Sequence, residues 1–273
     1  MTERKLRVAH LSTNFTIGGA QDYLFMIVRS MDQSKFEPFV AGRMEGEWAE
    51  KAQSIPGVRA VNIPSLRRDI TPWHDLRAVV EIWRFCRTHH IDVLHTHCSK
   101  PGVVGRLGGW LAGVPSIIHT SHGFSFHDFM VPWKRRLYIL LERSMSRFTT
   151  VLLLYSEGNR RMAQELRIGA TQSVETFYYG IDPAPFAELV DRASVRAGLG
   201  FGPGDYVIGF TGRFSEQKGL HLLISAFAEI VPEFPSARLL LVGSGPLQQR
   251  LEGQSHHLGV RDKVVFTGLR SDI

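Results

Sequence analysis

Short apolar runs rich in leucine and β-branched residues alternate with longer segments of helical periodicity over the first 178 residues. This alternation is typical of βαβ units that build a parallel sheet. In one helical segment Leu24, Ile27, Val28 and Met31 recur at the spacing of a helix face. The pattern predicts strands at 6–12, 36–41, 58–63, 92–97, 116–120, 149–154 and 174–178, and helices at 20–31, 75–89, 103–111, 133–147 and 157–167.

A segment rich in glycine and proline at 180–185 interrupts this alternation, and a helix is expected after it at 188–197. A second, shorter alternation then predicts strands at 206–210, 238–242 and 264–266, with helices at 219–230 and 247–256. We therefore predict an α/β protein with a complete N-terminal Rossmann-like domain over residues 1–185, a linker over 186–205 and a partial C-terminal Rossmann-like domain over 206–273.

Composition supports a folded protein in a reducing compartment. Of the 273 residues 44% are hydrophobic and 21% are charged, which excludes disordered and collagen-like chains. Two cysteines, Cys86 and Cys98, are too few for a disulfide framework. No run of about 18 apolar residues occurs, and the N-terminus does not resemble a signal peptide. These features predict a soluble, cytoplasmic protein.

The net charge of +6 is concentrated in the N-terminal part, where residues 1–205 hold 25 basic and 20 acidic residues. This excess favours an anionic partner there, either a phosphorylated ligand or a lipid surface, although a mildly basic solvated surface explains it equally well. Nucleic acid is disfavoured because aromatic residues are not interleaved with Lys and Arg on any one stretch.

Four histidines fall at predicted strand ends, where the carboxyl edge of a parallel sheet borders the ligand crevice. His95 and His97 share a face, and we interpret them and His119 as hydrogen-bonded structural residues. His122 comes after its strand, so its ring can face the crevice. No metal site is predicted, because no acidic residue is close in sequence and Cys98 would face the other side.

Candidate anion contacts follow the strands of both alternations. No dinucleotide-binding or P-loop glycine motif occurs, but Gly18 and Gly19 directly precede a helix, whose first backbone N–H groups can meet an anion. Arg213 and Lys218 flank the start of a helix in the second alternation, as expected of a diphosphate clamp. Because no Asp-x-Asp occurs, these cations would replace a metal ion there.

The chain resembles the glycosyltransferase family 4 enzymes of the GT-B fold, which have two Rossmann-like domains. The resemblance covers the whole chain and depends on the order of several short motifs, each weak alone. They are Gly-Gly at 18–19, Ile-Asp-Val-Leu-His-Thr-His at 91–97, Ile-His-Thr-Ser-His-Gly at 118–123, Gly-Ile-Asp at 180–182, Gly-Arg-Phe-Ser-Glu-Gln-Lys-Gly at 212–219, Gly-Ser-Gly-Pro at 243–246 and Val-Phe-Thr-Gly at 265–268.

This resemblance implies retaining, metal-independent transfer of a sugar from a nucleotide-sugar donor to a glycan or lipid-linked acceptor in bacterial cell-surface polysaccharide synthesis, without a cofactor. It implies that His122 is catalytic and lies beside the reacting sugar. Six residues are implied in donor binding: Gly18, Gly19, Arg213, Lys218, Gly243 and Gly245. Of these, Gly245 would border the pocket of the base.

The sequence departs from the family pattern in two places. Tyr179 stands where the family usually has asparagine before Gly-Ile/Val-Asp, and the chain ends before the family's paired-glutamate motif. Glu157 and Glu165 have a similar separation, but we interpret them as helix-surface residues. Two other functions therefore stay open: a truncated remnant that binds nucleotide sugar or a partner without turnover, and a sugar-nucleotide epimerase.

The segment at 133–143 has basic residues on one side and aromatic or aliphatic residues on the other. This is typical of a helix at a membrane interface, and it predicts a peripheral contact at the inner face of the membrane. An amphipathic helix that packs its apolar stripe on the sheet is the competing interpretation.

Overall fold

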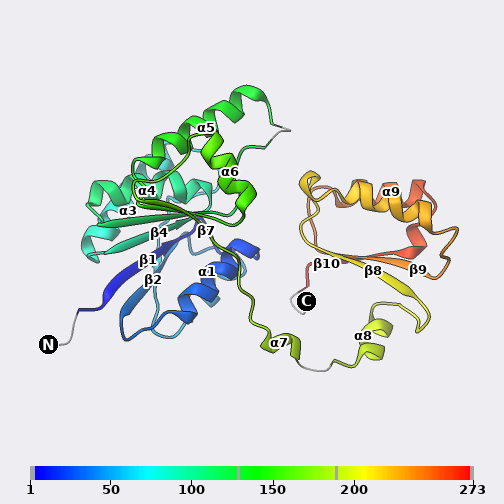
Figure 1. Cartoon of the computed structure of the whole chain (residues 1–273). Coiled ribbons are helices and arrows are strands. Elements are labelled where there is room, and N and C mark those ends of the chain that lie inside the picture. Colours follow the sequence, from blue (N-terminus) through cyan, green and yellow to red (C-terminus); the bar gives the residue numbers. More distant parts are fainter. Residues whose placement is uncertain (1–3, 128–129, 188–189, 271–273) are drawn as a thin grey trace. The chain divides into compact units, whose positions relative to one another are not determined.

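The computed structural model describes residues 4–127, 130–187 and 190–270, which form two compact units, Met1–Ile181 and Asp182–Ile273. The first unit has a seven-stranded parallel sheet with the order β3-β2-β1-β4-β5-β6-β7 (Figure 1). Its strands are β1 (Leu6–Leu11), β2 (Phe36–Gly42), β3 (Arg59–Asn62), β4 (Val93–His97), β5 (Ser116–Ser121), β6 (Val151–Leu154) and β7 (Ser173–Thr176). Its helices are α1 (Gly19–Ser30), α2 (Ala49–Gln53), α3 (Pro72–Thr88), α4 (Ser99–Ala112), α5 (Pro132–Ser146) and α6 (Glu157–Glu165).

Helices cover both faces of this sheet, which is why its strands are apolar runs. Alternate residues of β2 enter different cores: Phe39 packs in a cluster with residues of α3 and α4, whereas Val40 packs in a cluster with residues of α1 and α2. Figure 1 shows α1 on one face of the sheet and α3, α4 and α5 on the other. The sequence-predicted strands and helices of this unit are all present, with ends that differ by a few residues.

A buried ion pair joins two helices of the first unit. Arg106 of α4 is fully buried and donates to the Glu142 carboxylate of α5 at 2.7 Å. Its remaining donors reach the Thr149 hydroxyl at 3.2 Å and the Gly102 carbonyl. These bonds satisfy a charge that would be costly to bury alone.

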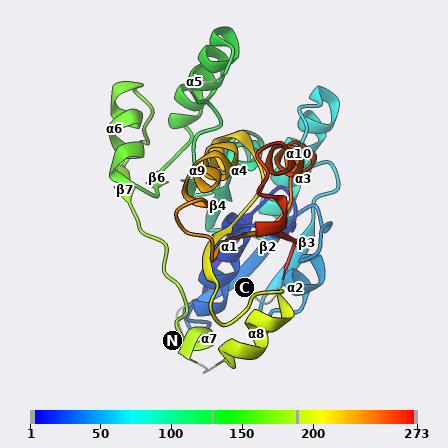
Figure 2. The ribbon, with the colours of Figure 1, turned by 90° about the vertical axis from the view of Figure 1, so that its right-hand side faces the viewer.

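The second unit has a three-stranded parallel sheet with the order β10-β9-β8. Helices α9 and α10 pack side by side against it (Figure 2). Its elements are α7 (Ala184–Ala187), α8 (Arg192–Gly198), β8 (Tyr206–Thr211), the 3-10 turn η1 (Glu216–Lys218), α9 (Leu220–Ile230), β9 (Ala237–Val242), α10 (Gln248–His257), the 3-10 turn η2 (Arg261–Lys263) and β10 (Val264–Gly268).

The single helix expected at 188–197 is wrong in its start. A helix instead begins at Arg192, because the Asp191 carboxylate accepts hydrogen bonds from the backbone N–H groups of Ala193 and Ser194. Residues 188–189, where that helix was expected to begin, lie outside the described residues.

Candidate functional site

The sheet of the first unit reverses its winding direction between β1 and β4, so the chain leaves these neighbouring strands toward opposite faces. A crevice at the carboxyl ends of such strands is the usual ligand site of an open α/β sheet. The turn with Gly18 and Gly19 follows β1, and Cys98 follows β4 in the left-handed backbone region, with φ 65°. Strained backbone at a non-glycine residue is typical of functional sites.

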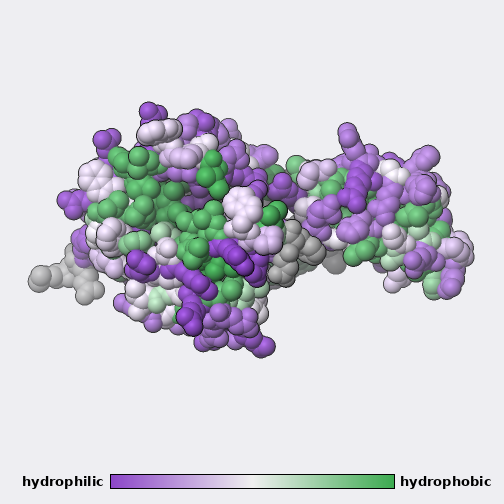
Figure 3. All heavy atoms as spheres, turned by 90° about the horizontal axis from the view of Figure 1, so that it is seen from above, coloured by the Kyte–Doolittle hydropathy of each residue, from purple (hydrophilic) through white to green (hydrophobic). Residues whose placement is uncertain are grey.

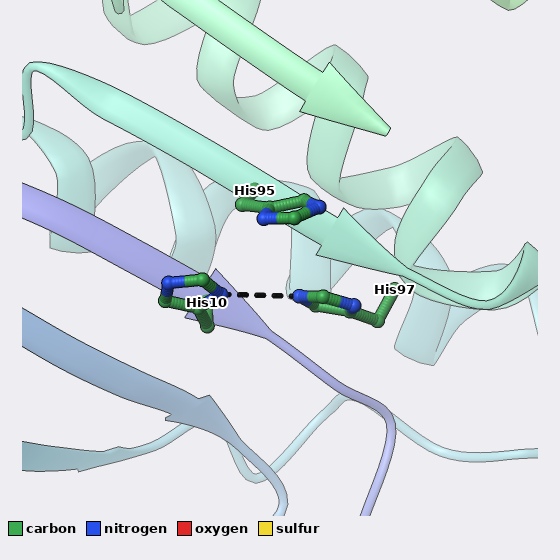
Figure 4. Close-up of side chains that lie close together, drawn as sticks. All are labelled: His10, His95 and His97. Atoms are coloured by element: carbon green, nitrogen blue, oxygen red, sulfur yellow. Dashed lines mark hydrogen bonds between the residues drawn. The ribbon is translucent and has the colours of Figure 1, made fainter. Parts of the chain in front are cut away.

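Three histidine rings gather at this edge (Figure 4). His10 of β1 lies opposite His95 of β4 in the strand register, and its ring centroid is 5.0 Å from that of His95. The rings of His95 and His97 lie on the same face of β4, as expected, with centroids 4.1 Å apart. All three are buried.

Two of the strand histidines have structural hydrogen bonds. The Nε2 atom of His95 lies 2.7 Å from the Thr120 hydroxyl, and the Nδ1 atom of His119 lies 2.9 Å from the Thr96 hydroxyl. The structural interpretation of His95 and His119 is confirmed.

His97 is also hydrogen-bonded, as predicted, and it connects the interior of the cluster to its accessible side. Its Nε2 atom lies 3.2 Å from Nδ1 of His10, and its Nδ1 atom lies 3.1 Å from Nε2 of His122. The Nδ1 atom of His122 lies 2.5 Å from the hydroxyl of Tyr179. Tyr23 of α1 adds ring contacts to His122 at 5.6 Å and to Tyr179 at 4.8 Å.

These side chains form an uncharged polar cluster at neutral pH. Burial lowers the pKa of His10 and of His122 to about 4, and it holds the pKa of His95 and of His97 well below 6.5. Burial also raises the pKa of Tyr179 to about 12. The cluster can therefore donate and accept hydrogen bonds toward a ligand without presenting a charge.

The same three histidines, His10, His95 and His97, could each offer a nitrogen atom to a metal ion, with these atoms within 4.8 Å of one another. A zinc ion requires the lone pairs of its ligands to converge on one point about 2 Å from each nitrogen. The planes of His95 and His97 are tilted by 34° to each other, and the Nε2 atom of His95 already pairs with the Thr120 hydroxyl. The Nε2 atom of His97 likewise pairs with Nδ1 of His10, so these nitrogens act as hydrogen-bonding groups in this structure.

Gly18 precedes α1 and Gly19 is its first residue, four residues before the Tyr23 that contacts the cluster. Gly18 has extended backbone, and a Cβ atom there would lie 3.0 Å from the Gln21 side chain. A Cβ atom on Gly19 would meet nothing within 4 Å. The fold therefore leaves open space beside Gly19.

In the second unit, Arg213 and Lys218 lie on the segment that joins β8 to α9. Both are exposed, and neither side chain has an ion pair or hydrogen bond with another residue of the described part of the chain. Gly219, in the left-handed region with φ 63°, ends the 3-10 turn and begins α9. Within the part of the chain that the structure describes, two cations without partners thus lie on the segment that leads from β8 to the start of α9.

Gly243 and Gly245 lie on the turn that follows β9, packed against the turn that follows β8. A Cβ atom on Gly243 would lie 2.0 Å from the Gly212 carbonyl oxygen, and one on Gly245 would lie 2.4 Å from that of Phe214. These glycines are required by the fold itself, whatever ligand the turn meets.

Helix α5 presents apolar side chains on two of its sides. Ile139 and Met145 are buried, whereas Trp133, Leu137 and Leu140 are exposed at 62, 48 and 56%. Figure 3 looks down on the side of the first unit that carries α3, α4 and α5 and shows apolar side chains gathered there. Among the described residues no helix is both long and apolar enough to cross a membrane.

The sequence did not point to His10 or Tyr179, which lie 87 and 57 residues from their partners His97 and His122. The only signal for Tyr179 was its departure from the family motif. Glu157 and Glu165 are exposed on α6, as predicted, and both cysteines are free.

Comparisons with known proteins agree with this fold. Residues 18–180 match the model of the glycosyl transferase 4-like domain, and residues 191–273 match that of the glycosyl transferases group 1. The chain is 25% identical over its whole length to UDP-Gal:alpha-D-GlcNAc-diphosphoundecaprenol alpha-1,3-galactosyltransferase of Escherichia coli, of which it spans 71%. It is 29% identical over 78% of its length to D-inositol 3-phosphate glycosyltransferase of Segniliparus rotundus, of which it spans 51%.

Among solved structures, Anabaena HepE in complex with UDP and glucose matches 98% of the chain with a TM-score of 0.77 at 21% identity, and the match spans 70% of HepE. The lipopolysaccharide-biosynthesis glycosyltransferase WaaG matches 97% of the chain with a TM-score of 0.72 at 15% identity, over 70% of its own length. Two Rossmann-like units of this kind define the GT-B architecture. The chain belongs to the group 1 glycosyltransferases, with a glycosyl transferase 4-like domain as its first unit.

Proposed function

We propose that the protein transfers a sugar from a nucleotide-sugar donor to a glycan or lipid-linked acceptor in cell-surface polysaccharide synthesis, with retention of configuration and without a metal ion. The observation that carries the proposal is the pair Arg213 and Lys218, two exposed cations without partners in the described chain, on the segment that leads from β8 to the start of α9. Guanidinium, ammonium and helix dipole together stabilise a departing diphosphate.

The related proteins support this choice of substrates. The name of the Escherichia coli relative states a UDP-linked galactose and a diphosphoundecaprenol-linked acceptor, and HepE binds UDP and glucose. By the family resemblance, Gly18, Gly19, Gly243 and Gly245 contribute to the donor site. His122 stabilises the reacting sugar, either directly or through a neighbouring group.

The clamp is tested with UDP and GDP as probes, each with EDTA present. Binding of the matching nucleotide should raise the melting temperature of the second unit in calorimetry, since a ligand at 100 times its Kd stabilises by about 2.7 kcal/mol. The Arg213→Ala/Lys218→Ala variant should lose this shift. The control, Arg192→Ala/Lys263→Ala, removes one arginine and one lysine away from this segment in the same unit and should keep it. A shift that survives in the clamp variant, or that requires a divalent ion, contradicts the proposal.

Turnover is tested by incubating the chain with radiolabelled UDP- and GDP-sugars, with and without a lipid-linked saccharide. Sustained transfer or hydrolysis supports the enzyme, and NMR of the product reports whether configuration is retained. Nucleotide binding without turnover is the result expected of a chain that only binds the donor. Isomerisation of the donor without an acceptor would indicate an epimerase.

A peripheral membrane contact through α5 is part of this proposal. The exposed Trp133, Leu137 and Leu140 can enter the headgroup region, while the basic Lys134 and Arg136 meet anionic lipid. Wild-type protein should sediment with vesicles that contain phosphatidylglycerol, and a Trp133→Ser/Leu137→Ser/Leu140→Ser variant should not. Equal sedimentation of both proteins would remove α5 as the contact.

A further inference from the structure

Both ring nitrogens of His122 are already in hydrogen bonds within the protein. Its Nε2 atom pairs with His97 at 3.1 Å, and its Nδ1 atom pairs with the Tyr179 hydroxyl at 2.5 Å. The rings of His122 and Tyr179 are nearly parallel, with 10° between their planes and centroids 5.9 Å apart. His122 therefore has no free nitrogen to offer a sugar.

The hydrogen bonds continue inward and couple the protonation of three rings. The chain runs from Tyr179 through His122 and His97 to His10, and every link between rings joins an Nδ1 atom to an Nε2 atom. A neutral imidazole carries a single N–H, so each ring donates on one side and accepts on the other. All three rings must then share one tautomer, and the chain of donors can point only inward or only outward.

The inner end of the chain favours the outward direction. The Nε2 atom of His10 is buried and has no hydrogen-bond partner within the described residues. An inward chain would place an N–H there, whereas an outward chain leaves a bare nitrogen. Buried N–H groups without a partner are rarer in proteins than unpaired acceptors. In the outward chain each ring is protonated on Nδ1, and His122 donates to the oxygen of Tyr179.

An outward chain leaves the hydroxyl hydrogen of Tyr179 free. Tyr179 is 42% exposed, and its ring is held by edge contacts with Tyr23 at 4.8 Å and Phe177 at 5.3 Å. Because burial raises the pKa of Tyr179 to about 12, the hydroxyl keeps its hydrogen at neutral pH. A phenol that accepts from an imidazole also donates more strongly, since hydrogen bonds in a chain polarise one another.

We propose that Tyr179, rather than His122, donates the hydrogen bond to a hydroxyl of the bound donor sugar, and that His122, His97 and His10 are positioning residues that fix the direction of this donor. The inference rests on the proposed use of a nucleotide sugar. It is consistent with tyrosine at the position where the family motif has asparagine, since a phenol and a carboxamide can each both accept and donate a hydrogen bond.

The direction of the hydrogen-bond chain is tested by NMR, and this test does not depend on enzyme activity. Two-bond ¹H–¹⁵N NMR spectra of histidine-labelled protein distinguish the two neutral tautomers, and single His→Gln variants assign the signals of the three rings. We expect His10, His97 and His122 all to carry hydrogen on Nδ1. An Nε2–H tautomer at His122 overturns the proposal, because the Tyr179 hydroxyl would then donate inward to the ring.

The sugar contact is tested with Tyr179→Phe, which removes only the hydroxyl. Isothermal titration compares UDP with UDP-glucose and UDP-galactose, and GDP with GDP-mannose, for each protein. The affinity that the sugar adds to the nucleotide should fall about three- to tenfold, the effect of one neutral hydrogen bond, while nucleotide affinity stays unchanged. Tyr178→Phe is the matched control, since its neighbouring ring is 78% exposed, and it should behave as wild type.

Removing both partners of the Tyr179–His122 hydrogen bond should lower sugar affinity no more than the larger of the two single changes does. The effects of Tyr179→Phe and His122→Phe on sugar affinity should therefore be non-additive. Sugar affinity that is unchanged or higher in Tyr179→Phe overturns the proposal, because freeing the His122 nitrogen would then help the ligand. If the wild-type protein binds neither nucleotide, the proposed function fails. The tautomer measurement still decides the direction of the hydrogen-bond chain.

Discussion

Lowering the pH from 7.5 to 5 should destabilise the first unit through its buried histidines, and His10 gives the clearest magnitude. Burial lowers the pKa of His10 from 6.5 to about 4. Between these two pH values the His10 ring is mostly protonated in the unfolded protein and mostly neutral in the folded protein. The stabilisation is complete above pH 6.5 and is lost as the pH falls toward 4. At pH 5, about 1.5 below the unfolded pKa, the loss from His10 alone is about 2 kcal/mol, at about 1.4 kcal/mol per unit of pH.

Tryptophan fluorescence isolates this effect, because all five tryptophans lie in the first unit. Urea unfolding followed by this signal at pH 7.5, 6.5, 5.5 and 5 gives the free energy of unfolding of that unit, at pH values where most carboxylates stay ionised. His95, His97 and His119, whose pKa values are also lowered by burial, should increase the loss beyond 2 kcal/mol.

Two variants separate the buried ring from an exposed one. His10→Gln should reduce the loss of stability between pH 7.5 and 5 by about 2 kcal/mol, whatever it does to stability at pH 7.5. His90→Asn is the control for the loss of a histidine as such, since residue 90 is exposed and asparagine tolerates its φ of 47°. A free energy of unfolding that does not change from pH 7.5 to 5 would refute the reasoning.

Three further predictions concern a buried ion pair, a tightly packed glycine and a glycine beside open space. Glu142→Ala should destabilise the first unit by about 3–5 kcal/mol in the same fluorescence assay, because it leaves the Arg106 charge buried without its partner. Lys35→Ala is the control at an exposed ion pair and should destabilise it by less than about 1 kcal/mol. Gly245→Ala should destabilise the second unit by about 1–3 kcal/mol in calorimetry, because its Cβ atom would overlap the Phe214 carbonyl. Gly19→Ala should leave stability unchanged and weaken UDP binding, since a Cβ atom there meets only open space. Unaltered UDP binding would show that Gly19 is not part of the donor site.

Much of the fold could be predicted because the strands of a sheet covered on both faces are continuous apolar runs. Helix α2, by contrast, has five residues, which is too short for a helical periodicity to appear. The helix expected at 188–197 was misplaced because its start depends on the capping carboxylate of Asp191 rather than on an apolar pattern.

The candidate site was predicted in part for a related reason. The i, i+2 spacing placed His95 and His97 on one face, but that spacing says nothing of other strands. His10 joins them only because β1 and β4, far apart in the chain, are neighbours in the sheet. Tyr179 reaches His122 from the segment after β7, and no local pattern encodes that contact.

The turns that follow β8 and β9 are packed closely against each other and joined by hydrogen bonds. Backbone hydrogen bonds run from Phe214 to Ser244 at 2.9 Å and from Leu247 back to Phe214 at 3.3 Å, and the glycines between them leave no spare volume. A displacement of the loop that carries Arg213 would therefore break hydrogen bonds to the loop that follows β9. A ligand bound by the Arg213 guanidinium would therefore also affect the start of α10. A bulky substitution in either loop would displace both loops.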